Sequence, residues 1–176
     1  MTIILDVTLL ENTDAAPRFS HEFSVADYLT HINTSNSTLL PKPLSLYVHI
    51  PFFQSPCAYL NYLYREIELL SPYLAQDRLV TQIYFASCSS GYLDSAQCRE
   101  ILDVIARNFH LNYPEGLEIS MGADSQHESF AGTDQIGLGV SAISQIGDAY
   151  IQNDRSLKNY YNSLDKDQLP IERGTI

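Results

Sequence analysis

LSLYVHI, residues 44–50, has the pattern of a β-strand and determines how the neighbouring sequence is interpreted. Leu44, Leu46, Val48 and Ile50 alternate with three more polar residues, which predicts a strand with two distinct faces. After a short loop, the stretch AYLNYLYREIELLSPYL (58–74) repeats its leucines and isoleucine at helical spacing. A strand followed directly by a helix is the first half of a β-α-β unit.

The same pattern continues along the chain. LVTQIYF (79–85) predicts a second strand, and LDSAQCREILDVIARNF (93–109) predicts a second helix, with Asp94 as N-cap and Gln97 completing a capping box. GLEISM (116–121) predicts a third strand. The alternation β-α-β-α-β is typical of parallel strands joined by right-handed crossovers, whose chemistry lies at the carboxyl ends of the strands.

The two flanks of this core are less regular. Residues 1–43 predict an irregular arm, with a strand at 3–10 and a linker at HINTSNSTLLPKP (31–43). Residues 126–176 are rich in glycine and end in a short helix within DRSLKNYYNSLDKDQL (154–169). We therefore divide the chain into an arm (1–43), a β/α core (44–125) and a C-terminal segment (126–176).

Composition excludes several classes of partner. The chain has 176 residues and a net charge of −11, which opposes binding to nucleic acids and anionic membranes. Its three cysteines are too few for a disulfide framework and favour a reducing cytoplasm. No apolar run reaches membrane-spanning length, and the N-terminus is too acidic for a signal peptide.

Several residues could carry chemistry. His49 lies in the first predicted strand, and Cys57 and Cys88 follow strands. Together they could bind a metal, but ordinary thiols and a histidine bonded to the backbone are the simpler interpretation. GLGVSA (137–142) matches the dinucleotide pattern G-x-G-x-x-A. We reject it because the stretch before it, QHESFAGTDQ (126–135), is not a predicted strand, and we expect a tight turn or close backbone packing instead.

Three blocks together resemble a known family. LSLYVHIPF (44–52), YLDSAQCREILDVIARNF (92–109) and IGLGVSAISQIGDAYIQN (136–153) are similar to the oxygen-independent coproporphyrinogen III oxidases, the radical SAM enzymes of anaerobic haem synthesis. The resemblance implies a partial (β/α) barrel. It also implies a [4Fe-4S] cluster on a C-x3-C-x2-C motif after HIPF, and a Gly-Gly-Gly-Thr-Pro motif along S-adenosylmethionine (SAM).

The chain departs from that family at each of these elements. Phe53 takes the first cysteine position, Cys57 takes the second, and the third falls in a missing segment. ASCSSG (86–91) replaces the glycine-rich motif, and Gly122 stands where the family has an acidic SAM contact. One thiolate cannot hold a cubane cluster, so we expect no cofactor.

Four residues still match family positions. By resemblance, Tyr47, Ser89 and Ile143 are vestigial cofactor-binding residues, and Cys57 is a vestigial cluster ligand that is not sufficient alone. The barrel strands expected after Ser125 are absent, so the resemblance implies a truncated partial barrel with an exposed sheet edge, through which the chain could form a homo-oligomer.

These observations favour a degenerate relative of the family without cluster-dependent SAM radical chemistry. Two alternatives stay open. One is a tetrapyrrole-binding or protein-interaction module. The other is an active enzyme that oxidatively decarboxylates coproporphyrinogen III.

Overall fold

The computed structural model describes residues 18–51, 56–86, 93–113, 116–122 and 132–176. Their helices and strands are arranged along the chain in this order: α1 (Val25–Asn36), β1 (Leu44–His49), α2 (Pro56–Leu70), the 3-10 helix η2 (Ser71–Tyr73), β2 (Leu79–Ala86), α3 (Ser95–Asn108), β3 (His110–Leu111), β4 (Glu118–Gly122), β5 (Asp134–Leu138), β6 (Ile143–Ile146), β7 (Ala149–Asn153), α4 (Leu157–Leu164) and β8 (Ile171–Thr175).

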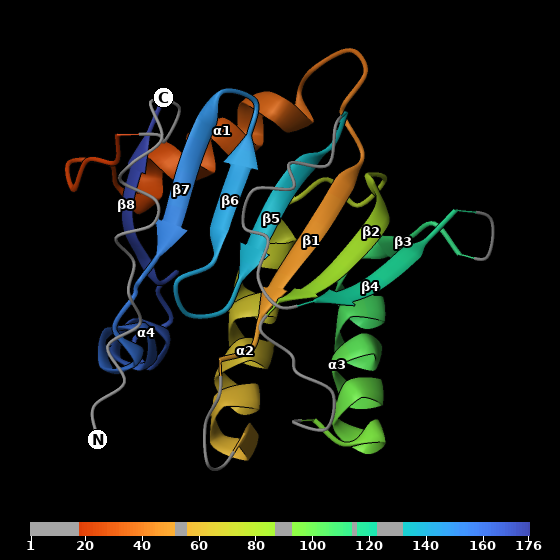
Figure 1. Cartoon of the computed structure of the whole chain (residues 1–176). Coiled ribbons are helices and arrows are strands. Elements are labelled where there is room, and N and C mark those ends of the chain that lie inside the picture. Colours follow the sequence, from red (N-terminus) through yellow and green to blue (C-terminus); the bar gives the residue numbers. More distant parts are fainter. Residues whose placement is uncertain (1–17, 52–55, 87–92, 114–115, 123–131) are drawn as a thin grey trace.

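All eight strands form one sheet (Figure 1). Strands β4, β2, β1 and β5 run parallel, and β3 pairs in parallel with the first residues of β2. Strands β6, β7 and β8 continue the sheet in antiparallel order. β1 is therefore central, with β2 on one side and β5, from far along the chain, on the other.

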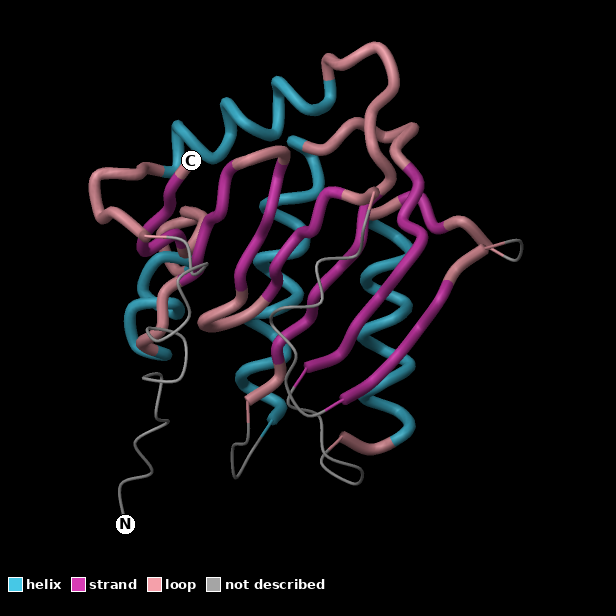
Figure 2. The backbone as a smooth tube through the Cα atoms, turned by 45° about the horizontal axis from the view of Figure 1, so that its top comes forward, coloured by secondary structure: helices cyan, strands magenta, loops and turns pink. Residues whose placement is uncertain are grey.

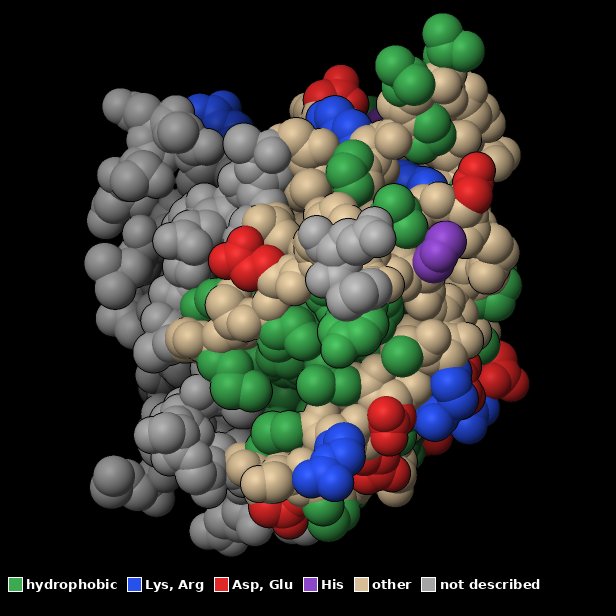
Figure 3. Space-filling view, turned by 90° about the vertical axis from the view of Figure 1, so that its right-hand side faces the viewer, with side chains coloured by type: hydrophobic (Ala, Val, Ile, Leu, Met, Phe, Trp, Pro, Cys, Tyr) green, Lys and Arg blue, Asp and Glu red, His purple; other side chains and the backbone are tan. Residues whose placement is uncertain are grey.

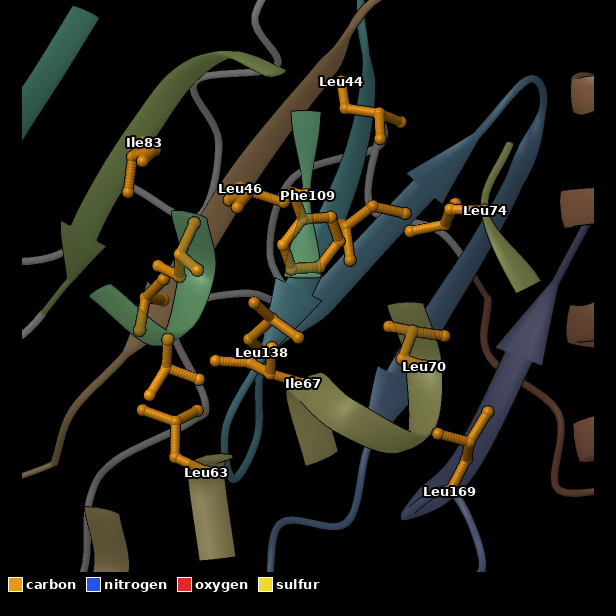
Figure 4. Close-up of a cluster of buried hydrophobic side chains, with 14 of the residues drawn as sticks. Leu44, Leu46, Leu63, Ile67, Leu70, Leu74, Ile83, Phe109, Leu138 and Leu169 are labelled. Atoms are coloured by element: carbon orange, nitrogen blue, oxygen red, sulfur yellow. The ribbon is translucent and has the colours of Figure 1, made fainter. Parts of the chain in front are cut away.

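Helices α2 and α3 lie on one face of the parallel strands, as Figures 1 and 2 show. The main core fills the space between that face and the helices, and all four α-helices contribute side chains to it. Figure 4 shows part of it, with the following residues labelled: Leu44, Leu46, Leu63, Ile67, Leu70, Leu74, Ile83, Phe109, Leu138 and Leu169.

The predicted parallel α/β core is confirmed. In α2 the four residues at helical spacing, Leu60, Leu63, Ile67 and Leu70, are all buried. Helix α3 begins after Asp94, whose carboxylate accepts hydrogen bonds from the backbone of Ala96 and Gln97, and the capping box is complete. β1 differs in one respect: both of its faces are buried, because the strand lies in the middle of the sheet.

The prediction of an irregular arm was wrong for residues 25–36, which form α1. Ser24 caps this helix, and the Asp27 carboxylate accepts a hydrogen bond from the Ser24 backbone. Tyr28 and Ile32, one turn apart, are buried against the sheet. Thr30 and His31 between them, and the polar run that follows Ile32, obscure this stripe in the sequence. The predicted strand at 3–10 lies outside the described residues.

The C-terminal segment also contains more structure than predicted. Its short helix is confirmed as α4, with Tyr160 and Leu164 buried. However, residues 134–153 and 171–175 form four strands that extend the sheet. The sequence pattern missed them because β5 is buried throughout and shows no polar alternation. Among the described residues, no helix is both long enough and apolar enough to cross a membrane.

Candidate functional site

Tyr47, one of the matching family positions, lies on β1 and faces away from the main core, in a separate buried cluster. Tyr47 of β1 and Tyr84 of β2 are register partners, and their rings stack with centroids 5.9 Å apart. Together with Ala86 and Ala142 they form a second, small apolar cluster, in which all four residues are buried. The two tyrosine rings therefore fill the space that they line.

Tyr84 also limits which side chain position 122 of β4 can carry. Its hydroxyl lies so close to the Cα of Gly122 that a Cβ at position 122 would collide with it. Position 122 is where the resemblance places an acidic SAM contact. A carboxylate side chain cannot be accommodated there unless Tyr84 moves. Gly122 and Tyr84 are thus parts of one local packing arrangement.

Cys57 lies in the first turn of α2 and is exposed. Its Sγ accepts a hydrogen bond from Nε2 of Gln97 on α3, at 3.9 Å. Cys98 of α3 is half-buried. Within the described ranges, no three His, Cys, Asp or Glu side chains gather in a way that could hold a metal ion. Phe53, Cys88 and Ser89 lie outside those ranges.

His49 has a structural role, as the simpler interpretation predicted. Its Nδ1 donates to the carbonyl oxygen of Val140 at 2.5 Å. The Tyr59 hydroxyl donates to the carbonyl oxygen of His49 at 2.7 Å and accepts from the backbone N–H of Val140 at 3.1 Å. These contacts fasten the end of β1 and the helix α2 to the loop after β5.

The glycines of GLGVSA serve close packing, as predicted, and not a nucleotide. A Cβ at Gly137 would meet the backbone of Ile143, and one at Gly139, whose φ is +103°, would meet the carbonyl of His49 and the hydroxyl of Tyr59. Contrary to the prediction, a strand (β5) does precede the loop; but β6 comes after it, so no helix N-terminus faces a phosphate.

Two of the vestigial positions, Tyr47 of β1 and Ile143 of β6, lie on strands that β5 separates in the sheet. Tyr47 pairs with Gly137 in the β1–β5 register, and Gly137 lies directly against the backbone of Ile143. Ile143 is half-buried, and its carbonyl oxygen accepts a hydrogen bond from Nε2 of Gln135 at 3.0 Å. Tyr47 and Ile143 are thus held by sheet packing.

A buried carboxylate, Glu66 of α2, was missed by the sequence interpretation. Its Oε2 accepts from the Tyr160 hydroxyl at 2.6 Å and from the Gly139 N–H at 2.7 Å, and its Oε1 accepts from Nδ2 of Asn153 at 2.6 Å. Burial raises the pKa of Glu66 to about 7, against these hydrogen bonds, which favour the charged form. The sequence offered one sign of this buried carboxylate, namely a charged residue directly before Ile67, which faces inward.

A buried ion pair was missed as well. Arg78, just before β2, donates to Oδ2 of Asp134 at 2.8 Å, and both side chains are only 2% exposed. Arg78 also donates to the carbonyl oxygen of Lys42 and to Oδ1 of Asn36, and Asp134 accepts from Ser35 and from the backbone of Gly147. This network fixes the first residue of β5 to α1 and β2.

Comparison with known proteins gives a consistent result. No family model matches the chain. An oxygen-independent coproporphyrinogen III oxidase of Mannheimia haemolytica is 30% identical in an alignment of 144 residues that covers 68% of this chain and 97% of that relative. The enzyme of that name from Salmonella typhimurium is 29% identical in an alignment of 155 residues that covers 74% of this chain and 32% of the relative.

The fold has a solved counterpart. The structure of coproporphyrinogen III oxidase (HemN) from Escherichia coli, described as a radical SAM enzyme, matches with a TM-score of 0.73 at 18% identity. The alignment covers 97% of this chain and 80% of that one. At 18% identity this match is evidence for a shared fold and for nothing further. Measured against the Salmonella relative, the chain spans about a third of the length.

Proposed function

Because the chain belongs to the oxygen-independent coproporphyrinogen III oxidase family, we propose that it is a degenerate member without cluster-dependent SAM radical chemistry. The observation that carries this proposal is the isolation of Cys57. A [4Fe-4S] cluster that chelates SAM needs three thiolates and one open iron. Phe53 stands at the first ligand position, and Cys57 is the only cysteine in the sequence from HIPF to the end of α2.

The SAM side supports the same proposal. Tyr84 occupies the space that a carboxylate at position 122 would need, and it stacks on Tyr47 in a buried cluster. The residues present therefore do not fit the cluster or SAM as the family holds them. The proposed function accordingly includes no reaction step through either group.

The test is anaerobic reconstitution of the full chain with ferrous iron and sulfide, and then incubation with SAM and a strong reductant. We expect iron binding equal to that of Cys57→Ser, no cluster signal in absorbance or electron paramagnetic resonance, and no 5′-deoxyadenosine. A cluster that cleaves SAM in the wild-type chain and is lost in Cys57→Ser would overturn the proposal and favour an active decarboxylase.

A tetrapyrrole-binding or protein-interaction role is the alternative. His49 is the residue best suited to a haem iron, but it is buried. The rings of Tyr47 and Tyr84 stack on each other and so leave less ring surface for a planar ligand. Titration with haem and with coproporphyrin III tests this role, and saturable spectral changes lost in His49→Ala would support it. The cysteine usage and net charge are consistent with a cytoplasmic protein that binds neither nucleic acid nor membrane.

A further inference from the structure

The two outer edges of the sheet differ in how they are protected. At one edge, β8 is bridged by Ser20: the Ser20 N–H donates to the carbonyl oxygen of Gly174 at 2.7 Å, and the Gly174 N–H donates back at 3.0 Å. Glu172 of β8 is paired with Arg155 at 2.9 Å. Charged side chains and a covering segment are the usual means by which proteins prevent an edge strand from pairing with another chain.

Among the described residues, the other edge has no covering segment and only one charged side chain on its strand. There β4 pairs with β2 and with no other strand. Ile119 and Met121 are 46% and 55% exposed, and Tyr113, just before β4, is 80% exposed. The single charge of β4 is Glu118, at its first residue. Figure 3 looks onto this side of the molecule and shows hydrophobic side chains gathered there.

The exposed apolar residues of β4 continue the main core outward. Ile119 is the register partner of Ile83, and Met121 is the register partner of Phe85. Ile83 and Phe85 are fully buried on the helix-covered face of β2. Side chains alternate between the two faces of a strand, so Ile119 and Met121 extend this same face beyond the last strand that is covered.

We propose that a second copy of this chain covers the edge, with the two β4 strands paired antiparallel about a two-fold axis through Ser120. In this register Ile119 faces the partner's Met121, and the reciprocal pair is identical. Glu118 faces the partner's Gly122, so the two carboxylates of the interface do not oppose each other. The strand is thus complementary to itself, which an interface with two-fold symmetry requires.

Sedimentation equilibrium of the full chain tests the proposal. We expect a reversible monomer–dimer equilibrium that tightens with added salt, because each chain carries a net charge of −11. Ile119→Lys places an ammonium against the partner's Met121 and is expected to weaken dimerisation at least about tenfold. The matched control is Leu39→Lys, at a residue that is 97% exposed in the connection before β1, and it should leave the equilibrium unchanged.

The register is tested by charge swap and by cross-linking. Met121→Glu alone should weaken the dimer, whereas Ile119→Lys with Met121→Glu in one chain should restore it, because each new ammonium then faces a new carboxylate. Ser120→Cys should form an intermolecular disulfide under mild oxidation, since paired residues on the axis lie about 4.5–5.5 Å apart between Cα atoms. Leu39→Cys is the control, and the wild-type chain corrects for its own thiols.

Three results would overturn the proposal. They are a monomer at every concentration, association that Ile119→Lys leaves unchanged, and cross-linking of Ser120→Cys no faster than that of Leu39→Cys. Thermal unfolding of each variant shows whether the monomer stays folded, so that a lost dimer is not mistaken for a lost fold.

Discussion

Replacing Glu66 by glutamine should change how the stability of the protein depends on pH. Burial raises the pKa of this carboxyl from 4.5 to about 7 in the folded chain. The folded protein therefore holds the proton more tightly than the unfolded chain does. The contribution of Glu66 to the free energy of unfolding is largest below pH 4.5, falls as the pH rises from 4.5 to about 7, and is constant above that.

The size of the effect comes from the two pKa values. A carboxyl whose pKa moves from 4.5 to about 7 on folding contributes about 3 kcal/mol to the difference in stability between the two ends of this pH range. For a chain of this length that corresponds to about 6–12 °C in the melting temperature. Glutamine has nearly the same shape as glutamate and does not titrate, so the stability of the variant lacks this contribution to its pH dependence.

A constant penalty accompanies the substitution. Tyr160, Gly139 and Asn153 all donate hydrogen bonds to Glu66, and an amide offers one acceptor oxygen and one donor nitrogen. One of these donors loses its acceptor, at a cost of about 1–3 kcal/mol that does not vary with pH. The wild-type chain should therefore exceed Glu66→Gln in stability most strongly at acidic pH, and the gap should narrow toward neutrality.

The measurement is urea unfolding of both chains at several pH values between 4 and 8, with the difference in free energy plotted against pH. Other carboxyls that titrate differently on folding, such as Asp134, Asp154 and Glu172, contribute equally to both chains and cancel. Glu68→Gln, an exposed glutamate on the same helix, is the control and should behave as the wild type does. A difference that stays flat with pH would refute the reasoning.

Three further predictions concern packing, each measured by urea unfolding. Gly122→Ala should lower the free energy of unfolding by about 1–3 kcal/mol because its methyl collides with the Tyr84 hydroxyl. Most of this loss should disappear in a Tyr84→Phe background, and an unchanged loss there would contradict the assigned clash. Arg78→Met should cost about 3–5 kcal/mol by leaving Asp134 buried without its partner, and adding Asp134→Leu should recover part of it; no recovery would argue against a penalty from the unpaired charge. Gly139→Ala should cost at least about 1–3 kcal/mol, since φ is +103° and the methyl has no space; a neutral result would show that the loop relaxes.

The helices of the β/α core could be predicted from the sequence because their signals are local. The inward stripe of α2 and the capping box of α3 are each contained within a few turns of chain. By contrast, β5 is recognisable only through its neighbour β1, which precedes it by most of the length of the core. Strands buried on both faces lose the alternation that marks a strand in sequence, and their partners come from elsewhere in the chain.

The candidate site likewise combines features with a local sequence signal and features that depend on distant parts of the chain. The family resemblance implies a C-x3-C-x2-C motif, and on that pattern Phe53 and Cys57 mark an incomplete ligand set in the sequence. The tyrosine that accompanies Gly122 could not be foreseen, because β2 and β4 meet only after α3 has crossed between them. The partners of Glu66 come from the loop after β5, from β7 and from α4, so the carboxylate looked like an ordinary helix residue.

The late arrival of β5 beside β1 has a consequence during synthesis on the ribosome. Leu44 pairs with Asp134, so β1 waits for a partner that is made about 90 residues later, which at about 5–20 residues per second is roughly 5–20 s. Over that time one side of β1 presents unpaired backbone groups on a strand that is buried on both faces once folding is complete. A nascent chain in that condition is a natural client for chaperones.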